Sequence, residues 1–383
     1  MQNIVDNDFF DLIKEKTTST NPSIIKWPGG KDKELKIILN YLPSNFDNYY
    51  EPFVGGGSCF MNIDAKKYFI NDKCNELLSI YQVLQSKEKQ IFLNYLANFD
   101  EIWSEIKDFI NDNQTQIIEM YSSDTTKKQT IKYVVENAKK MQAINSFIQN
   151  DNDRDVFVRK LYNSVCNKAS RMHKINIVKA STNQDIVSNI ESATKSAFYN
   201  YCRYLMNDKS LEQTKILSTA IYFFVRNFAY SGMFRYNESG KFNVPYGGIG
   251  YNNNKFAKKI EYFNSDLINN KFNNTKAYCL DFEAFLNDSK PQKNDFIFLD
   301  PPYDTEFSTY ANNKFAQNDQ QRLADYLLKE CKANFMLIIK KTPFIEELYP
   351  SDKVNIKEFD KKYQVNFKNR NNQECIHLLI TNY

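Results

Sequence analysis

The motif Asp300-Pro301-Pro302-Tyr303 follows an apolar run, Phe296–Leu299, that is typical of a buried strand. Two successive prolines cannot continue a strand's hydrogen-bonding ladder, so they end the strand and fix the backbone. The motif therefore places a carboxylate, the rigid Pro301 carbonyl and an aromatic ring together at the carboxyl end of a strand. Ligands bind at this edge in open α/β sheets.

This combination suits the activation of an exocyclic amine on a nucleic-acid base. Such an amine is a poor nucleophile because its lone pair is delocalised into the ring. The Asp300 carboxylate and the Pro301 carbonyl could accept its two N–H bonds and localise the lone pair towards an electrophilic methyl group, while Tyr303 stacks on the base. The alternative is a proline-bounded turn with a solvated acid, which the rigid strand-end motif disfavours.

A second candidate group is the run Glu51-Pro52-Phe53-Val54-Gly55-Gly56-Gly57-Ser58, with Asp72 downstream. Glycines let the backbone approach a ligand and begin a helix whose first N–H groups are free. Asp72 could accept hydrogen bonds from both hydroxyls of a ribose. Phe60 stands where the dinucleotide fingerprint needs a third glycine, which counts against NAD or FAD. A tight strand–helix turn without a ligand remains the alternative.

Short strands must position both groups. The pattern predicts strands at 47–54 and 68–71, a helix beginning at 58–65, and further strands at 276–280, 295–299, 334–339 and 375–381. Residues 82–216 are instead polar, glycine-free and helical in period. An apolar helix at 219–228 precedes a Gly, Asn and Pro-rich stretch that predicts loops or a hairpin near 230–250. We therefore predict a discontinuous catalytic domain, 1–81 and 276–383, with an inserted recognition domain at 82–275.

Composition excludes several classes of protein. The chain has 383 residues, 42% of them hydrophobic, which suits a globular protein of two domains or one domain with a large insertion. Two histidines argue against a His-based zinc site or a Ser–His–Asp triad, so we expect no metal. Seven scattered cysteines argue against a disulfide framework and favour a reducing cytosol. No apolar run approaches a membrane span, and the acidic N-terminus is not a signal peptide.

Local charge is more informative than the net charge of +4. Between residues 154 and 179 the only acid is Asp155, whereas seven residues are basic: Arg154, Arg159, Lys160, Lys168, Arg171, Lys174 and Lys179. A solvated helix face is the simpler interpretation of such a run. The functional interpretation is a surface for phosphates.

Taken together, these motifs resemble the Dam-type adenine-specific DNA methyltransferases. Besides the two motifs above, Lys26-Trp27-Pro28-Gly29-Gly30-Lys31 is similar to the family's N-terminal cofactor motif, with Pro28 where alanine is usual. Arg235-Tyr236-Asn237 and the run from Gly240 to Gly247 look like its DNA-recognition hairpin. The similarity covers roughly 24–80, 217–250, 276–310 and the C-terminal strands. Residues 82–216 match nothing in the family that can be placed.

The resemblance implies a class I methyltransferase fold: a mixed, mostly parallel sheet with helices on both faces and an antiparallel C-terminal strand. It also implies S-adenosylmethionine as cofactor and adenine N6 as acceptor. Trp27 and Lys31 would lie near the methionine end of the cofactor, although core packing is an equal alternative for Trp27. The implied cofactor-binding residues are Trp27, Lys31, Phe53, Gly55, Gly57, Asp72 (ribose), Asp281 and Phe282 (adenine), and Asp300.

The implied DNA contacts come from Tyr230, Ser231, Met233, Arg235, Asn237 and Pro245. An arginine fork reads guanine in the major groove, and Arg235 is the candidate, with a phosphate clamp as an equal alternative. Ser231 replaces the asparagine of enteric relatives, so the recognised sequence does not follow. The target base must be flipped out, and residues 304–318 are predicted as a loop that closes over it. Residues 368–372 are predicted as a solvated turn.

We therefore predict a site-specific DNA methyltransferase that transfers a methyl group from S-adenosylmethionine to adenine N6 in double-stranded DNA. We expect a monomer in the bacterial cytosol or nucleoid, without membrane association, and a restriction endonuclease encoded nearby as a functional partner. One alternative is a cytosine-N4 methyltransferase, which usually has Ser where Asp300 stands. The other is a DNA-binding relative that has lost catalysis.

Overall fold

The structure is a computed structural model that describes residues 20–124, 126–148, 150–176, 181–208, 213–302, 315–361 and 375–383. The chain divides into two compact units. The first unit consists of Met1–Leu78 and Lys271–Tyr383, and the second of Ser79–Asn270. Each unit is described separately below.

In the first unit, seven strands of the described residues form one sheet in the order β3-β2-β1-β4-β5-β7-β6. Neighbours from β3 to β5 are parallel, whereas β7 is antiparallel to both β5 and β6. The strands are β1 (Asn48–Glu51), β2 (Lys67–Asn71), β3 (Thr275–Tyr278), β4 (Phe296–Leu299), β5 (Asn334–Lys340), β6 (Asn355–Lys361) and β7 (Cys375–Thr381). The predicted class I methyltransferase fold is confirmed, and β6 is an element that the sequence did not predict.

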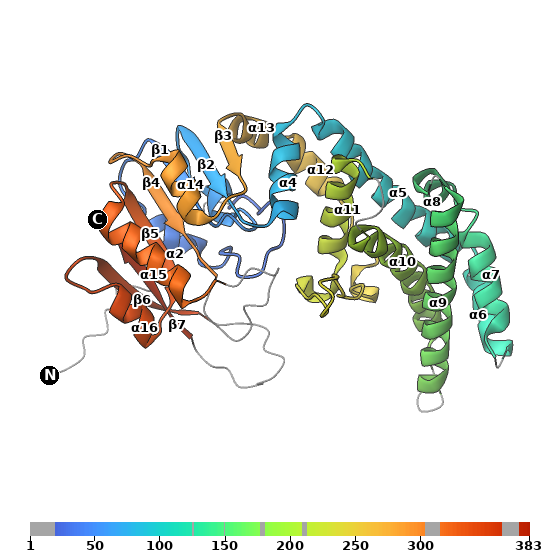
Figure 1. The fold of residues 1–383 in the computed structure, drawn as a ribbon. Coiled ribbons are helices and arrows are strands. Elements are labelled where there is room, and N and C mark those ends of the chain that lie inside the picture. Colours follow the sequence, from blue (N-terminus) through green and yellow to red (C-terminus); the bar gives the residue numbers. More distant parts are fainter. Residues whose placement is uncertain are drawn as a thin grey trace. The chain divides into compact units, whose positions relative to one another are not determined.

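Helices cover both faces of this sheet (Figure 1). They are α2 (Leu35–Asn40), α3 (Ser58–Asn62), α14 (Phe282–Ser289), α15 (Gln317–Asp325), a π-helix (Tyr326–Glu330) and α16 (Pro343–Leu348). Two further helices, α4 (Asn75–Gln85) and α13 (Asp266–Asn273), contain the boundaries between the units.

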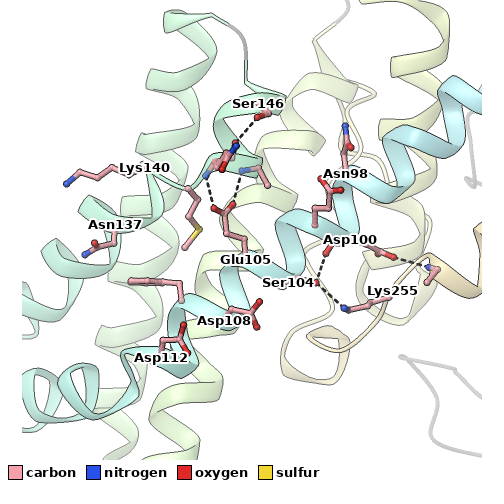
Figure 2. Close-up of a pocket in the computed structure, with 16 residues that line it drawn as sticks. Asn98, Asp100, Ser104, Glu105, Asp108, Asp112, Asn137, Lys140, Ser146 and Lys255 are labelled. Atoms are coloured by element: carbon pink, nitrogen blue, oxygen red, sulfur yellow. Dashed lines mark hydrogen bonds between the residues drawn. The ribbon is translucent and has the colours of Figure 1, made fainter.

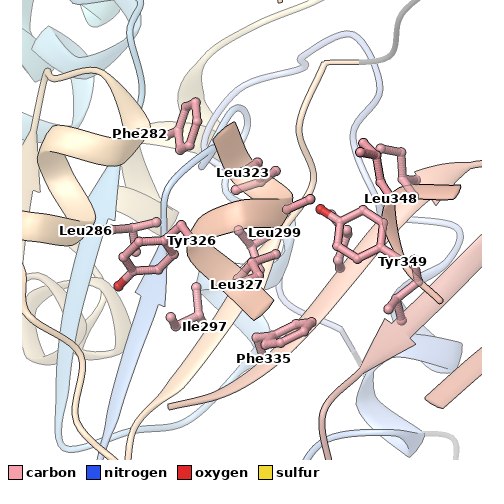
Figure 3. Close-up of a cluster of buried hydrophobic side chains, with 14 of the residues drawn as sticks. Phe282, Leu286, Ile297, Leu299, Leu323, Tyr326, Leu327, Phe335, Leu348 and Tyr349 are labelled. Atoms are coloured by element: carbon pink, nitrogen blue, oxygen red, sulfur yellow. The ribbon is translucent and has the colours of Figure 1, made fainter. Parts of the chain in front are cut away.

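Alternation along the strands separates two apolar layers. On one face, Ile297 and Leu299 of β4 and Phe335 of β5 pack under α14, α15 and the π-helix (Figure 3). On the other face, Tyr49 of β1 contacts Tyr68 of β2, whose ring meets Phe60 of α3 edge-on at 5.6 Å. Apolar residues on both faces explain why the central strands read as continuous hydrophobic runs.

The second unit is helical. It contains α5 (Lys89–Asp112), α6 (Gln114–Ser123), α7 (Lys128–Ala138), α8 (Gln142–Phe147), α9 (Asp151–Asn176), α10 (Asn183–Asn207), α11 (Lys215–Phe228) and α12 (Ala257–Asn264). Thr182 begins α10 with a capping box, in which its side chain and that of Asp185 each bond the other's backbone N–H. The described helices include none long and apolar enough to cross a membrane.

Residues 229–254, here named the 229–254 loop, connect α11 to α12. Antiparallel bridges join Ala229 to Tyr246 and Tyr236 to Phe242, so the chain folds back on itself as a short hairpin. Single 3-10 turns stand at Tyr230–Gly232 and Ile249–Tyr251. Ser231 has a φ of 52°, a left-handed conformation that is unusual for a residue other than glycine.

Candidate active site

The loop between β1 and α3 requires its glycines. Gly55 and Gly57 have φ of 49° and 80°, which side-chain-bearing residues rarely adopt. A Cβ atom on Gly55 would lie 2.9 Å from Cδ1 of Trp27, and one on Gly56 would lie 2.5 Å from the Ile25 carbonyl oxygen. The glycines therefore allow the Trp27 indole to lie directly against the loop, which the sequence alone left open.

Asp72 stands just after β2 and is bound to this loop. Its carboxylate accepts the backbone N–H of Gly55 at 3.1 Å and that of Cys74 at 2.9 Å. Burial raises the pKa of Asp72 to about 6, and these backbone hydrogen bonds oppose the rise. The acid is thus fixed at the strand end, with lone pairs left for a further donor.

A buried asparagine joins the neighbouring strand ends. The Asn71 amide donates to the Pro52 carbonyl at 3.0 Å and to the Leu280 carbonyl at 3.1 Å, and its oxygen accepts the Leu280 N–H at 2.9 Å. The chain segments that follow β1, β2 and β3 are held together in this way. Asn71 was not predicted as a site residue.

Lys31 and Asp300 form an ion pair. The lysine is 3% exposed and also donates to the Gly29 carbonyl at 3.0 Å, whereas Asp300 is 19% exposed. Within the described residues nothing donates to the Pro301 carbonyl, and Gln320 Nε2 donates to the Pro302 carbonyl at 3.2 Å. The structure therefore brings the N-terminal motif to the Asp-Pro-Pro motif, with the acid as the more accessible partner.

Glu51, at the end of β1, is buried and accepts the Tyr49 hydroxyl at 2.8 Å. Burial raises the pKa of Glu51 well above its usual range, and the Asp300 charge adds to the rise. Lys271 is also buried and donates to the Phe60 and Ile63 carbonyls, at 2.7 and 2.8 Å, near the end of α3. Burial lowers the pKa of Lys271 to about 8. Glu51 belongs to the predicted candidate run but was given no role of its own, and Lys271 was not predicted.

Three aromatic rings meet beside the glycine loop. The ring centroids of Phe53, Phe282 and Phe315 lie 5.5–5.7 Å apart. Asp281 begins α14 by accepting the Glu283 N–H, and it also pairs with Arg322 of α15 at 2.6 Å. The predicted pair Asp281–Phe282 therefore lies at this cluster, and Arg322, which no local pattern indicated, holds the Asp281 carboxylate.

Tyr303 and most of the predicted closing loop, residues 304–318, lie outside the described residues, as do residues 368–372. The part of the closing loop that is described begins at Phe315. Across the described residues, no group of three or more His, Cys, Asp or Glu side chains is arranged to hold a metal ion.

In the second unit, the predicted DNA-contacting residues gather in the 229–254 loop. Five are exposed and Met233 is half-buried; the exposed ones are Tyr230, Ser231, Arg235, Asn237 and Pro245. The Arg235 guanidinium donates to the Asn243 side chain at 2.8 Å and to the Asn243 carbonyl at 3.1 Å. Asn243, on the opposite side of the same hairpin, thus orients the Arg235 guanidinium through its Nε and one terminal nitrogen.

Two arginines that were not predicted hold this loop. Arg226 of α11 is buried, donates to the Met233 carbonyl at 2.7 Å and stacks 3.7 Å from the Phe234 ring. Arg203 of α10 donates to the Val244 carbonyl at 2.7 Å. Charge-assisted hydrogen bonds from these two arginines therefore anchor the hairpin to α11 and α10.

A polar groove of about 940 Å³ lies within the second unit, between α5, α8 and the start of α12 (Figure 2). Two of its acids act as helix caps. Glu105 accepts the backbone N–H groups of Gln142 and Ala143, at 2.7 and 2.8 Å, and Asp100 accepts those that begin α12. None of the predicted site residues lines this groove.

Comparison with known proteins gives a consistent family. A family model described as D12 class N6 adenine-specific DNA methyltransferase matches residues 27–171 and 152–365. The Type II methyltransferase M.CviBI of Paramecium bursaria Chlorella virus NC1A is 25% identical over 365 residues, which cover 94% of this chain and 99% of the relative.

Relatives from other sources agree. The Type II methyltransferase M.MjaIII of Methanocaldococcus jannaschii is 25% identical, with 94% of this chain and 98% of the relative covered. A DNA adenine methylase of Vibrio cholerae is 22% identical, with 94% of this chain and 96% of the relative covered. The similarity thus extends through both units.

Proposed function

The chain belongs to the D12 class of N6 adenine-specific DNA methyltransferases, and on this premise we propose that it transfers the methyl group of S-adenosylmethionine to adenine N6 in a short double-stranded DNA site, after the base is flipped out. The observation that supports this most is the edge of the sheet at which Asp72, bound to the glycine loop, and Asp300, paired with Lys31, both stand. In parallel sheets this edge binds ligands.

The residues at this edge fit the cofactor. Asp72 would accept the ribose hydroxyls, because its oxygens are oriented by the Gly55 and Cys74 N–H groups. Phe53 and Phe282 would offer an apolar surface to the adenine ring, since both rings belong to one cluster. The loop of Gly55 and Gly57, with Trp27 against it, would surround the methionine end. When bound, the cofactor supplies an electrophilic methyl group.

Asp300 and the Pro301 carbonyl would accept the two N–H bonds of the target amine, with Pro302 and Tyr303 completing the motif. The buried Lys31 ammonium pairs with the Asp300 carboxylate and so orients it at the strand end. Asp300 would therefore bind and orient the amine, and the proton that N6 loses on methylation would pass to water. An aspartate at this position favours adenine over cytosine N4.

We propose that the 229–254 loop contacts the DNA through Tyr230, Ser231, Met233, Arg235, Asn237 and Pro245. Arg235 can fork onto guanine or hold a phosphate, and the binding of Arg235→Ala to matched and single-mismatch duplexes separates the two. If Arg235 reads a base, Arg235→Ala relaxes discrimination at one base pair. If Arg235 holds a phosphate, Arg235→Ala weakens binding to every sequence equally. We further propose that the protein acts as a monomer in the cytosol, beside a restriction endonuclease encoded nearby; two relatives are named Type II methyltransferases.

Substitution of Asp300 tests this function. We expect Asp300→Ala to lower kcat by about 10²–10³-fold, because an oriented electrostatic contact made in the transition state is lost. Calorimetry with S-adenosylmethionine would show whether the variant still folds and binds. Asp352→Ala, which removes an exposed acid of the same unit, is the matched control. Retention of more than about a hundredth of the wild-type kcat would reject the role of Asp300.

A further inference from the structure

The long helix α9 has one apolar and one basic face. Its buried positions are Phe157, Leu161, Val165, Ala169 and Met172, all at most 4% exposed, and they recur every three or four residues. Lys160 and Arg171 are eleven residues apart, about three turns of helix, so they lie on one face, and Lys174 follows one turn later. From Val156 to Ile175, α9 contains no acid.

The basic face begins at the 229–254 loop. The Lys160 ammonium lies 5.1 Å from the ring of Tyr204 on α10. The residue before that tyrosine, Arg203, donates to the Val244 carbonyl, and Arg235 donates to the neighbouring Asn243. Lys160 of α9, Arg203 of α10 and Arg235 of the loop therefore form one row, which these contacts with Tyr204, Val244 and Asn243 connect.

These cations repel one another and are not neutralised within the protein. Among the described residues, none of Lys160, Arg171, Lys174, Arg203 and Arg235 forms an ion pair with an acid. Burial lowers the pKa of Lys160, and the charges of Arg203 and Arg159 lower it further. Burial also lowers the pKa of Arg203, and the charge of Arg235 adds to this effect. A row of like charges in which no cation is paired with an acid is stabilised by an external polyanion.

We propose that the basic face of α9 binds the phosphate backbone of the DNA that flanks the target site. The inference rests on the proposed function, because the 229–254 loop is taken as the part that contacts the site. From Lys160 to Lys174 the helix rises about 21 Å, at about 1.5 Å per residue. This length matches about six base pairs at about 3.4 Å each.

The test uses the full chain and a 30-base-pair duplex of random sequence, because phosphate contacts do not depend on sequence. Binding is measured over a series of salt concentrations for the wild type, Arg171→Gln/Lys174→Gln and Lys128→Gln/Lys132→Gln. The last variant removes two exposed lysines from α7 and so matches the charge change. We expect the α9 variant alone to lose about 1.8 from the slope of log K against log salt, about 0.9 for each phosphate contact.

An unchanged slope for the α9 variant, or an equal loss for the α7 variant, would overturn the proposal. Tighter binding of an RNA duplex with the same loss of slope would overturn it in favour of RNA. Methylation of unmodified genomic DNA by the wild type is scored in parallel. If the wild type makes no N6-methyladenine but the α9 slope still falls, the proposed function fails and the DNA-binding surface stands.

Discussion

At the scale of single residues, Asp72 illustrates how burying an acid lowers the stability of the fold. Burial raises its pKa to about 6, and only backbone N–H groups bond it among the partners described above. In the unfolded chain the carboxyl ionises near its ordinary pKa of about 3.9. Between these values the folded chain binds more protons than the unfolded chain, so stability falls as pH rises.

We therefore expect the free energy of unfolding of the wild type to fall relative to that of Asp72→Ala as pH rises from about 4 to 6. The fall should be about 1.4 kcal/mol for each unit by which the pKa is raised. Urea unfolding of both proteins at a series of pH values measures the difference. Parallel curves would show that Asp72 ionises in the folded state as it does in the unfolded chain.

The sequence alone was sufficient to predict candidate site residues whose residue type is restricted by backbone geometry. Asp300 with its two prolines and the Gly55–Gly57 loop could be found because strand-end acids, prolines and glycines are restricted by backbone geometry. The buried Lys271 and Arg226 could not, because their partners are backbone carbonyls distant in sequence or irregular in structure. No local pattern distinguishes them from solvated cations.

At the scale of elements, the groove of the second unit shows that a side chain distant in sequence can cap the N-terminus of a helix. Glu105 of α5 bonds the first N–H groups of α8, which is a six-residue helix without a side-chain cap of its own. Such N–H groups otherwise depend on water or a neighbouring side chain. Glu105 is therefore a structural acid of this groove.

We expect Glu105→Ala to lower the free energy of unfolding by about 0.5–2 kcal/mol, the usual cost of losing an N-terminal cap. Asp112→Ala removes an exposed acid that lines the same groove and should change stability by less than about 0.5 kcal/mol. Thermal unfolding measures both. If both variants lowered the free energy of unfolding equally, Glu105 would contribute through its charge rather than by capping α8.

Most strands were predictable because they are short apolar runs closed by an acid or a turn. β6, Asn355–Lys361, was missed because only Ile356 and Phe359 among its residues are apolar, without strand alternation, and because it pairs with β7 alone. Edge strands of this kind resemble exposed loops in sequence. The helical character of residues 82–216 was visible in their period, whereas the way α9 packs on α10 required the structure.

At the scale of the whole molecule, the two units divide different tasks in our account. We propose that the strand edge of the first unit holds the cofactor and the target amine, and that the loop and basic helix of the second unit hold the DNA. Each unit has its own core, since the sheet and its helices form one and the aromatic helices α5, α10 and α11 form the other. A methyl transfer to DNA needs both.

The most direct measurement is mass spectrometry of nucleosides from unmethylated DNA incubated with the purified protein and S-adenosylmethionine. The account predicts N6-methyladenine, which disappears when the cofactor is omitted or when Asp300→Ala replaces the wild type. N4-methylcytosine in place of N6-methyladenine, or no modified base at all from a folded protein that binds both the cofactor and DNA, would contradict it.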